Sequence, residues 1–278
     1  MRVLVTGAGG QLGHDVAARF AAHHDVIAAT RSQLDIGDRD AALGAITALR
    51  PAVIVNCGAW TADDACESES DRAYRDNALA VRWVADGARR VDAFVVHIST
   101  DYVFRGDKAG AYLEWDEPGP QSVYGRSKLA GERELGPGAC IVRTSWVSGA
   151  NGANMTKTIL RLAGEHERLR FVDDQRGCPS FTEDLAAAIY RLAIDRRPGV
   201  HHITNSGAVS WFGFAQAVLS AAGLDPGRVE PITTADMPRP APRPANSVLD
   251  NAAWRLAGLP PLDDFREPLA RLVRQLRG

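Results

Sequence analysis

Short apolar, β-branched runs alternate with longer amphipathic stretches through the first half of the chain. The runs favour strands, and the stretches between them favour helices over residues 11–22, 38–49, 71–91 and from 122 onward. Alternation at this spacing requires right-handed crossovers and a parallel sheet with helices on both faces. The sequence therefore predicts a doubly wound, Rossmann-type α/β fold. The predicted strands are Arg2–Thr6, Asp25–Thr30, Val53–Asn56, Phe94–Ser99 and Ile141–Arg143.

The second half of the chain is less regular and predicts a smaller C-terminal α/β domain. Helices are expected over 184–195, 210–222 and 265–276, and a strand over 200–204. Four prolines within 236–244 exclude a helix there. The pattern loosens near residues 146–151, so we predict domains at 1–148 and 149–278, with some crossing of the chain between them.

Composition excludes several classes of protein. The 278 residues carry a formal net charge of −2, which would not concentrate a polyanion, so nucleic acid is not expected as a partner. No run is apolar over the roughly 18 residues that a membrane span needs, so no membrane partner is expected. The four cysteines are far apart, which argues against a disulfide scaffold or a metal site. With no basic-then-apolar leader, a cytoplasmic protein is expected.

Three glycines at three-residue spacing follow the first predicted strand and open the first helix. Gly7 would allow a tight turn, Gly10 would let the backbone approach a phosphate, and Gly13 would let the helix pack on the sheet. The N-terminus of the helix offers free N–H groups and a partial positive charge to an anion. This context predicts a dinucleotide-binding turn.

The end of the second strand helps to choose the dinucleotide. NAD sites usually place a carboxylate there, whereas this chain has Arg31, with Asp35 four positions further on. A guanidinium would pair with a 2′-phosphate, which favours NADPH. NADH stays possible, because Arg31 could equally be a solvated loop residue.

Tyr124 and Lys128 are four residues apart in a predicted helix and share one face of it. A neighbouring cation favours the phenolate, so we expect Lys128 to lower the pKa of Tyr124. Thr100 follows the fourth predicted strand, at the edge where doubly wound sheets bind ligands, and its hydroxyl could share developing charge on a substrate oxygen. We predict these three residues as the catalytic group.

Together these motifs resemble the extended short-chain dehydrogenase/reductase superfamily, and within it the dTDP-4-dehydrorhamnose reductases. The likeness covers nearly the whole chain. It rests on the segments 7–13, 34–36, 55–61, 99–104, 124–132, 143–146, 174–179 and 243–250. The glycine turn and the tyrosine–lysine pair specify only the superfamily, while 99–104 and 243–250 point to the reductase branch.

The resemblance implies roles for further residues. Around the cofactor they are Gly10, Gln11 and Leu12 at the pyrophosphate, Asp35 and Ile36 at the adenine, and Ala59, Trp60 and Thr61 near the nicotinamide. Around the substrate they are Thr100, Asp101, Trp146, Arg176, Arg243 and Asn246. Ser148, Met155 and the Cys57–Gly58 pair depart from the family pattern near the sugar or the cofactor, so the identity of the deoxyhexose stays open.

The implied reaction is NADPH-dependent reduction of the C4 carbonyl of a dTDP-linked 4-dehydro-6-deoxyhexose, most simply dTDP-4-dehydrorhamnose to dTDP-L-rhamnose. Two alternatives stay open. One is a sugar-nucleotide epimerase or dehydratase of the same superfamily, although the glutamate that dehydratases carry two residues after Thr100 is here Tyr102. The other is a regulatory subunit that binds NADP without catalysis. A homodimer is the commonest assembly and also stays open.

Overall fold

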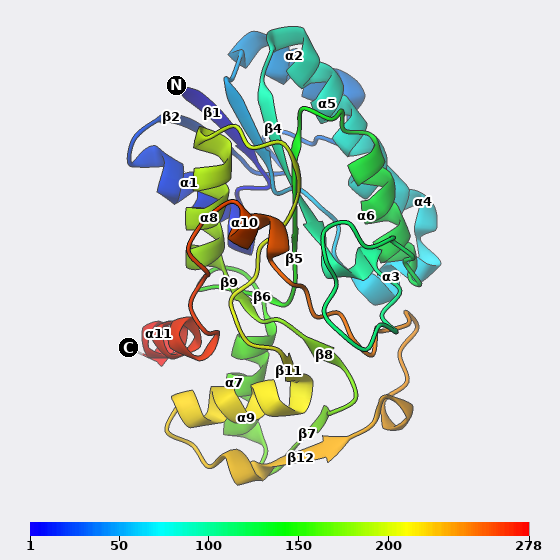
Figure 1. Ribbon diagram of the computed structural model, residues 1–278, viewed down its shortest axis with the longest axis vertical. Helices are drawn as coiled ribbons and strands as arrows, with labels where there is room; N and C mark the ends of the chain where they lie inside the picture. The colour runs from blue at the N-terminus through cyan, green and yellow to red at the C-terminus, as the bar shows by residue number, and fades with distance from the viewer. Residues whose placement is uncertain (278) are drawn as a thin grey trace.

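The computed structural model describes residues 1–277 and shows a larger lobe built on a central sheet, with a smaller lobe beside one end of it (Figure 1). Within these residues the sheet has six parallel strands in the order β10-β5-β4-β3-β1-β2. The doubly wound fold predicted from the sequence is confirmed. The strands are β1 (Arg2–Thr6), β2 (Asp25–Ala29), β3 (Val53–Asn56), β4 (Phe94–Thr100), β5 (Cys140–Thr144) and β10 (Gly199–His202).

Helices cover both faces of this sheet. On one face α1 (Gln11–Ala21) packs against α8 (Thr182–Ile194), and on the other α2 (Arg39–Leu49) packs against α5 (Ala80–Val91) (Figure 1). Beside α5 lies α6 (Val123–Arg133). None of the helices within residues 1–277 is both long enough and apolar enough to cross a lipid bilayer.

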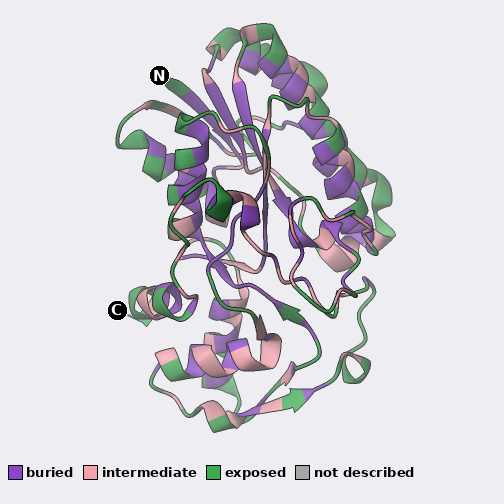
Figure 2. Ribbon diagram, viewed as in Figure 1, coloured by how far each residue is buried: buried purple, intermediate pink, exposed green. Residues whose placement is uncertain are grey.

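Alternation along the strands explains why both faces need helices. Val3 and Val5 of β1 pack in one apolar cluster with Ile189 of α8, while Leu4 between them packs in another with Val84 of α5. Successive side chains of a strand point to opposite faces, so a strand that is apolar at every position must be covered twice. Figure 2 shows the resulting layers, with buried strands inside and exposed residues on the outer sides of the helices.

The long helix expected over residues 71–91 is interrupted. It consists of α4 (Ser70–Tyr74), a π-helical turn η1 (Arg75–Leu79) and α5. Within the turn, the Asn77 side chain bonds both backbone groups of Trp60, at 2.8 and 2.9 Å, and the Ser127 hydroxyl at 3.0 Å. These bonds to neighbouring segments offset the poorer geometry of the π turn, which periodicity alone does not reveal.

The smaller lobe has its own apolar core. Two paired strands lie along it, and the sheet of the larger lobe does not include them. Its core elements are α7 (Met155–Glu165), α9 (Trp211–Ala221), α11 (Arg266–Arg277), β7 (Leu169–Val172) and β12 (Val229–Ile232). The remaining short elements of the larger lobe are α3 (Asp63–Ser68), η2 (Asp101–Val103) and α10 (Ala252–Leu256). The other short elements are β6 (Val147–Ser148), β8 (Arg176–Gly177), β9 (Ser180–Phe181), β11 (Val209–Ser210), η3 (Pro226–Arg228) and η4 (Thr234–Asp236).

The chain crosses between the lobes after residue 148. Both α8 and β10 follow that position in the sequence, yet β10 pairs with β5 and α8 packs on α1. We keep the division into 1–148 and 149–278 as a proposal, with α8, β10 and α10, which packs on β10, returning to the larger lobe.

Candidate active site

Two adjoining cavities lie at the carboxyl ends of the parallel strands, where doubly wound sheets bind ligands. The first cavity has a volume of about 440 Å³ and the second about 500 Å³. Gly10, Cys57 and Ala59 line both, so the two form one continuous cleft. Of the predicted site residues, Gly7, Arg31, Asp35 and Ile36 line the first cavity, and Gln11, Leu12, Gly13, Thr61, Thr100, Asp101, Tyr124, Lys128 and Trp146 line the second.

The glycine turn has the shape that a phosphate group requires. Gly7 has a φ of +68°, and a Cβ there would come within 2.6 Å of the Gly58 nitrogen. A Cβ on Gly13 would overlap the Gly7 carbonyl oxygen. Helix α1 begins after Gly10, and no side chain within residues 1–277 caps it. Its first N–H groups therefore face the cleft as donors for an anion, which fits the diphosphate of a dinucleotide.

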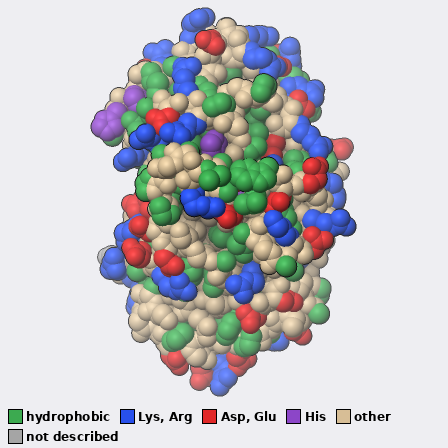
Figure 3. Space-filling view, in the orientation of Figure 1, with side chains coloured by type: hydrophobic (Ala, Val, Ile, Leu, Met, Phe, Trp, Pro, Cys, Tyr) green, Lys and Arg blue, Asp and Glu red, His purple; other side chains and the backbone are tan. Residues whose placement is uncertain are grey.

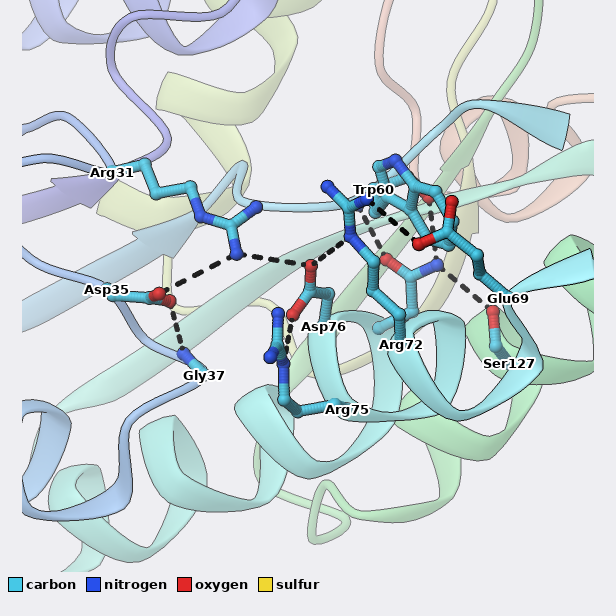
Figure 4. Close-up of polar contacts among 10 residues, drawn as sticks. Arg31, Asp35, Gly37, Trp60, Glu69, Arg72, Arg75, Asp76 and Ser127 are labelled. Atoms are coloured by element: carbon cyan, nitrogen blue, oxygen red, sulfur yellow. Dashed lines mark hydrogen bonds and ion pairs between the residues drawn. The ribbon is translucent and has the colours of Figure 1, made fainter. Parts of the chain in front are cut away.

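Charged side chains gather at the far end of the first cavity (Figure 4). The Arg31 guanidinium lies 3.3 Å from the Asp76 carboxylate and 3.6 Å from that of Asp35. Asp35 also accepts a hydrogen bond from the Gly37 N–H, at 2.9 Å. Arg31 thus bridges two carboxylates beside the cavity, in a position to meet either a ribose or its 2′-phosphate.

Asp76 was not predicted from the sequence. Although it is 8% exposed, it lines the first cavity and receives the Arg75 guanidinium at 2.8 Å and that of Arg72 at 3.8 Å. It lies in the π turn η1, whose position the apolar periodicity did not indicate. The signal that could have found it is the density of arginines in 72–75 directly before an aspartate.

The predicted catalytic residues come together in the second cavity. Thr100 ends β4, and Tyr124 and Lys128 occupy successive turns of α6. Helix α6 begins after Ser122, whose hydroxyl accepts a hydrogen bond from the Gly125 N–H at 3.0 Å. This cap fixes where the helix starts and so directs one face of it, with both side chains, toward the cleft.

The expected influence of Lys128 on Tyr124 is wrong for this arrangement. The pKa of the Tyr124 phenol is raised, first by burial and then by the negative charge of Asp63, and a hydrogen bond with Thr100 offsets part of the rise. Lys128 directs its amine elsewhere, to the Ile98 carbonyl at 2.7 Å and the His97 ring at 3.3 Å. Tyr124 is therefore a protonated phenol at neutral pH, which is the form of a proton donor.

Burial also shifts the other ionisable groups of the second cavity. It lowers the pKa of Lys128 to about 8, against an opposing contribution from Glu132. It raises the pKa of Asp101 to about 7 and that of Asp63 to about 6, although nearby Arg243 holds the latter down. Thr100 donates a hydrogen bond to Asp101 at 3.0 Å. Three groups thus titrate near neutrality around one cavity, which is common where protons are moved.

An aromatic wall closes the side of the second cavity that belongs to the smaller lobe. Trp146 stacks on Trp211 with ring centroids 3.5 Å apart and an angle of 5° between the planes. Both line the cavity. Trp211 opens the apolar helix α9, and nothing in the sequence around it distinguishes it from a core residue.

Four predicted site residues lie outside both cavities. The Trp60 ring is covered by the Arg72 guanidinium, 4.2 Å from the ring centre. Arg176 and Asn246 line a separate cavity of about 490 Å³, and Arg243 lines one of about 180 Å³ while it contacts Asp64 at 3.0 Å. None of the four lines the cavity of Thr100 and Tyr124, although Arg243 lies 3.7 Å from Asp63, which does.

Comparison with known proteins gives concordant matches. The family model described as "RmlD substrate binding domain" matches residues 1–277. A dTDP-4-dehydrorhamnose reductase of Mycobacterium tuberculosis is 45% identical, over 97% of this chain and 91% of that protein. A probable dTDP-4,6-dihydroxy-2-methyloxan-3-one 4-ketoreductase of Streptomyces antibioticus is 42% identical, over 97% and 93%. The crystal structure of dTDP-4-dehydrorhamnose reductase from Bacillus anthracis in complex with NADP superposes with a TM-score of 0.95, at 37% identity and 99% coverage of both chains.

Proposed function

Because this chain belongs to the RmlD substrate-binding domain family, we propose that it is an NADPH-dependent reductase that converts dTDP-4-dehydrorhamnose to dTDP-L-rhamnose. The observation that carries the proposal is that Thr100, Tyr124 and Lys128 line one cavity, and that this cavity is continuous with the one at the glycine turn. The similar Streptomyces ketoreductase is named for another dTDP-linked keto sugar, so the C4 ketone is the part of the substrate that the proposal fixes most firmly.

The cofactor would extend along both cavities. Gly7, Gly10 and the N-terminus of α1 would hold its diphosphate, and Arg31 would meet the 2′-phosphate of NADPH. The Bacillus anthracis reductase was crystallised with NADP, which supports this choice over NADH. When bound, the nicotinamide supplies the hydride.

The residues of the chain would handle the proton and the charge. Tyr124 is buried and protonated, so it would donate its proton to the carbonyl oxygen as that oxygen becomes an alkoxide. The Thr100 hydroxyl would donate a second hydrogen bond to the same oxygen. Lys128 would hold a ribose hydroxyl as a compact donor.

The substrate would occupy the second cavity. Asp101 and the Trp146 wall line it and would contact the hexose. Arg176, Arg243 and Asn246 line neighbouring cavities and would contact a more distant part of the nucleotide.

The cytoplasm is the proposed compartment. All four cysteines are free thiols, which suits reducing conditions. Acidic and basic side chains intermingle over the face shown in Figure 3, in keeping with a small-molecule substrate rather than a polyanion. A homodimer stays a prediction.

The test is an assay of the purified chain alone with NADPH and dTDP-4-dehydrorhamnose, with the product identified by NMR. We expect one NADPH oxidised for each dTDP-L-rhamnose formed. An isomerised sugar without net NADPH loss would instead indicate an epimerase. Tight NADPH binding without turnover on any dTDP-4-dehydro sugar would indicate a regulatory subunit.

A further inference from the structure

A chain of buried hydrogen bonds runs beneath the second cavity and ends at Lys128. The Thr6 hydroxyl lies 2.7 Å from Asn56 Oδ1, and Asn56 Nδ2 lies 3.1 Å from His97 Nδ1. On the other side of the ring, His97 Nε2 lies 3.3 Å from Lys128 Nζ. Asn56 and His97 have no exposed surface, and Lys128 is 2% exposed. With water excluded, each of these contacts needs a donor and an acceptor.

The orientation of the Asn56 amide is fixed by its backbone neighbour. The Gly58 N–H lies 3.2 Å from Asn56 Oδ1 and can only donate. The atom that faces it must therefore be the amide oxygen, which also accepts from the Thr6 hydroxyl. The Asn56 NH₂ group is left facing His97, so it donates to Nδ1 of the ring.

This donation selects one tautomer of His97. Burial, followed by the charge of Lys128, holds the pKa of His97 well below its usual value, so the ring is neutral. A neutral imidazole carries one proton, and because Nδ1 accepts from Asn56, that proton lies on Nε2. Nε2–H can only donate, and it points at the Lys128 amine.

An ammonium has three N–H donors and no lone pair, whereas a free amine can accept. We propose that His97 is a positioning residue whose Nε2–H favours the free amine of Lys128, and that Asn56 fixes the tautomer that does so. Lys128 still donates to the Ile98 carbonyl at 2.7 Å in either form. Protonation of Lys128 then requires His97 to move its proton to Nδ1 and to lose the Asn56 bond.

Other groups around Lys128 act on its charge as well. Glu132, on the same helix, favours the ammonium, but its carboxylate is held by the Arg143 guanidinium at 2.6 Å. The Cys57 thiol, after β3, has a pKa raised by burial to about 12 and is neutral. Tyr124, one turn away, is also neutral at ordinary pH. His97 is thus the group on β4 that opposes the charge of Lys128 by direct contact.

The role of this contact in catalysis rests on the proposed function, but the contact itself does not. NMR can therefore test it in a protein that is not turning over substrate. The chain has three lysines, Lys108, Lys128 and Lys157, so labelled lysine gives three titration curves that Lys→Arg variants assign. In labelled histidine, the ¹⁵N shifts of His97 report which nitrogen is protonated. Above the pH at which Lys128 titrates we expect Nε2–H in the wild-type chain, and Nδ1–H under those conditions would overturn the inference.

Two variants then test the link to Lys128. In His97→Gln the side-chain oxygen can accept from an ammonium, so the titration of Lys128 should move upward by about one unit, the worth of one hydrogen bond. Asn56→Asp keeps acceptors for Thr6 and Gly58 and should place the His97 proton on Nδ1, which the ¹⁵N shifts of His97 report. The Lys128 titration is not the readout for this variant, because the added carboxylate raises the pKa of Lys128 by its charge alone. His201→Gln, at a buried histidine of β10, is the matched control and should leave Lys128 unchanged.

An unchanged Lys128 titration in a folded His97→Gln chain would contradict the inference. If the His97→Gln chain does not fold, the position of the His97 proton in Asn56→Asp is the deciding test, and a proton that stays on Nε2 would contradict the inference. If the chain is a reductase whose Lys128 acts as the ammonium, its kcat/KM falls as pH rises through the Lys128 titration. The same fall should come about one unit higher in His97→Gln. If the chain shows no reductase activity, only the prediction for the pH dependence of kcat/KM is lost. The NMR test of His97 and Lys128 does not depend on activity.

Discussion

The two cavities of the cleft differ in how far water reaches their charged side chains. In the first, Arg31 and Asp35 are 55% and 47% exposed on the loop that follows β2, although Asp76, which pairs with Arg31, is 8% exposed. In the second, Lys128 and Tyr124 are buried on a capped helix. Water screens the first set, whereas in the second set burial is the largest cause of the shifted pKa of each residue.

The difference assigns separate tasks to the two ends. A loop with exposed arginines can adjust to a ribose or a phosphate, and each contact there contributes little because solvent competes. Buried groups on β4 and α6 are fixed in position, so removing one leaves its partners without solvent to replace it. Substitutions should therefore have large effects at the second cavity and small ones at the first.

Tyr124→Phe should produce the largest effect. Loss of the proposed acid should lower kcat by roughly 10²- to 10⁴-fold, while NADPH still binds, because the ring remains. Steady-state kinetics measure kcat, and a fluorescence titration with NADPH measures cofactor binding. Tyr74→Phe, at an exposed tyrosine, is the matched control. Turnover near the wild-type rate would remove Tyr124 from the proposed role.

Arg143→Met tests the buried ion pair below the same cavity. The Arg143 and Glu132 side chains are each 5% exposed, and Glu132 also accepts from the Ser99 hydroxyl at 2.5 Å. Removing the cation leaves a buried carboxylate without its partner, which should lower the free energy of unfolding by about 3–5 kcal/mol. Urea unfolding measures it. The matched control is Arg82→Met, which breaks the exposed pair with Glu134 and should cost far less. Equal losses would mean that burial does not separate the two pairs.

Sequence reasoning succeeded where local chemistry decides structure. The glycine turn predicted the start of α1. The helix predicted over 38–49 begins where the Asp38 side chain accepts hydrogen bonds from the N–H groups of Asp40 and Ala41. The spacing of Tyr124 and Lys128 predicted that both would face one cavity. Each of these features is encoded within a few neighbouring residues.

It failed where distant segments decide. The π turn that carries Asp76 depends on bonds from Asn77 to Trp60 and Ser127, which are far away in the sequence. Trp211 reaches the cleft only because α9 packs beside Trp146. The expected effect of Lys128 on Tyr124 was wrong because spacing shows that two side chains share a face, and not which partners their polar atoms choose.

Arg31→Ala should give the smallest effect and sharpen the contrast between the cavities. The guanidinium is more than half exposed and shared between Asp35 and Asp76, so its loss should raise KM for NADPH by roughly tenfold, as expected for one solvent-weakened charge-assisted bond. KM for NADH should stay nearly constant, since NADH lacks the 2′-phosphate. Arg39→Ala, an exposed arginine outside both cavities, is the control. Equal rises for the two cofactors would mean that Arg31 orders its loop rather than meeting a phosphate. A fall in kcat as large as that of Tyr124→Phe would mean that the two cavities are more tightly coupled than their exposure indicates.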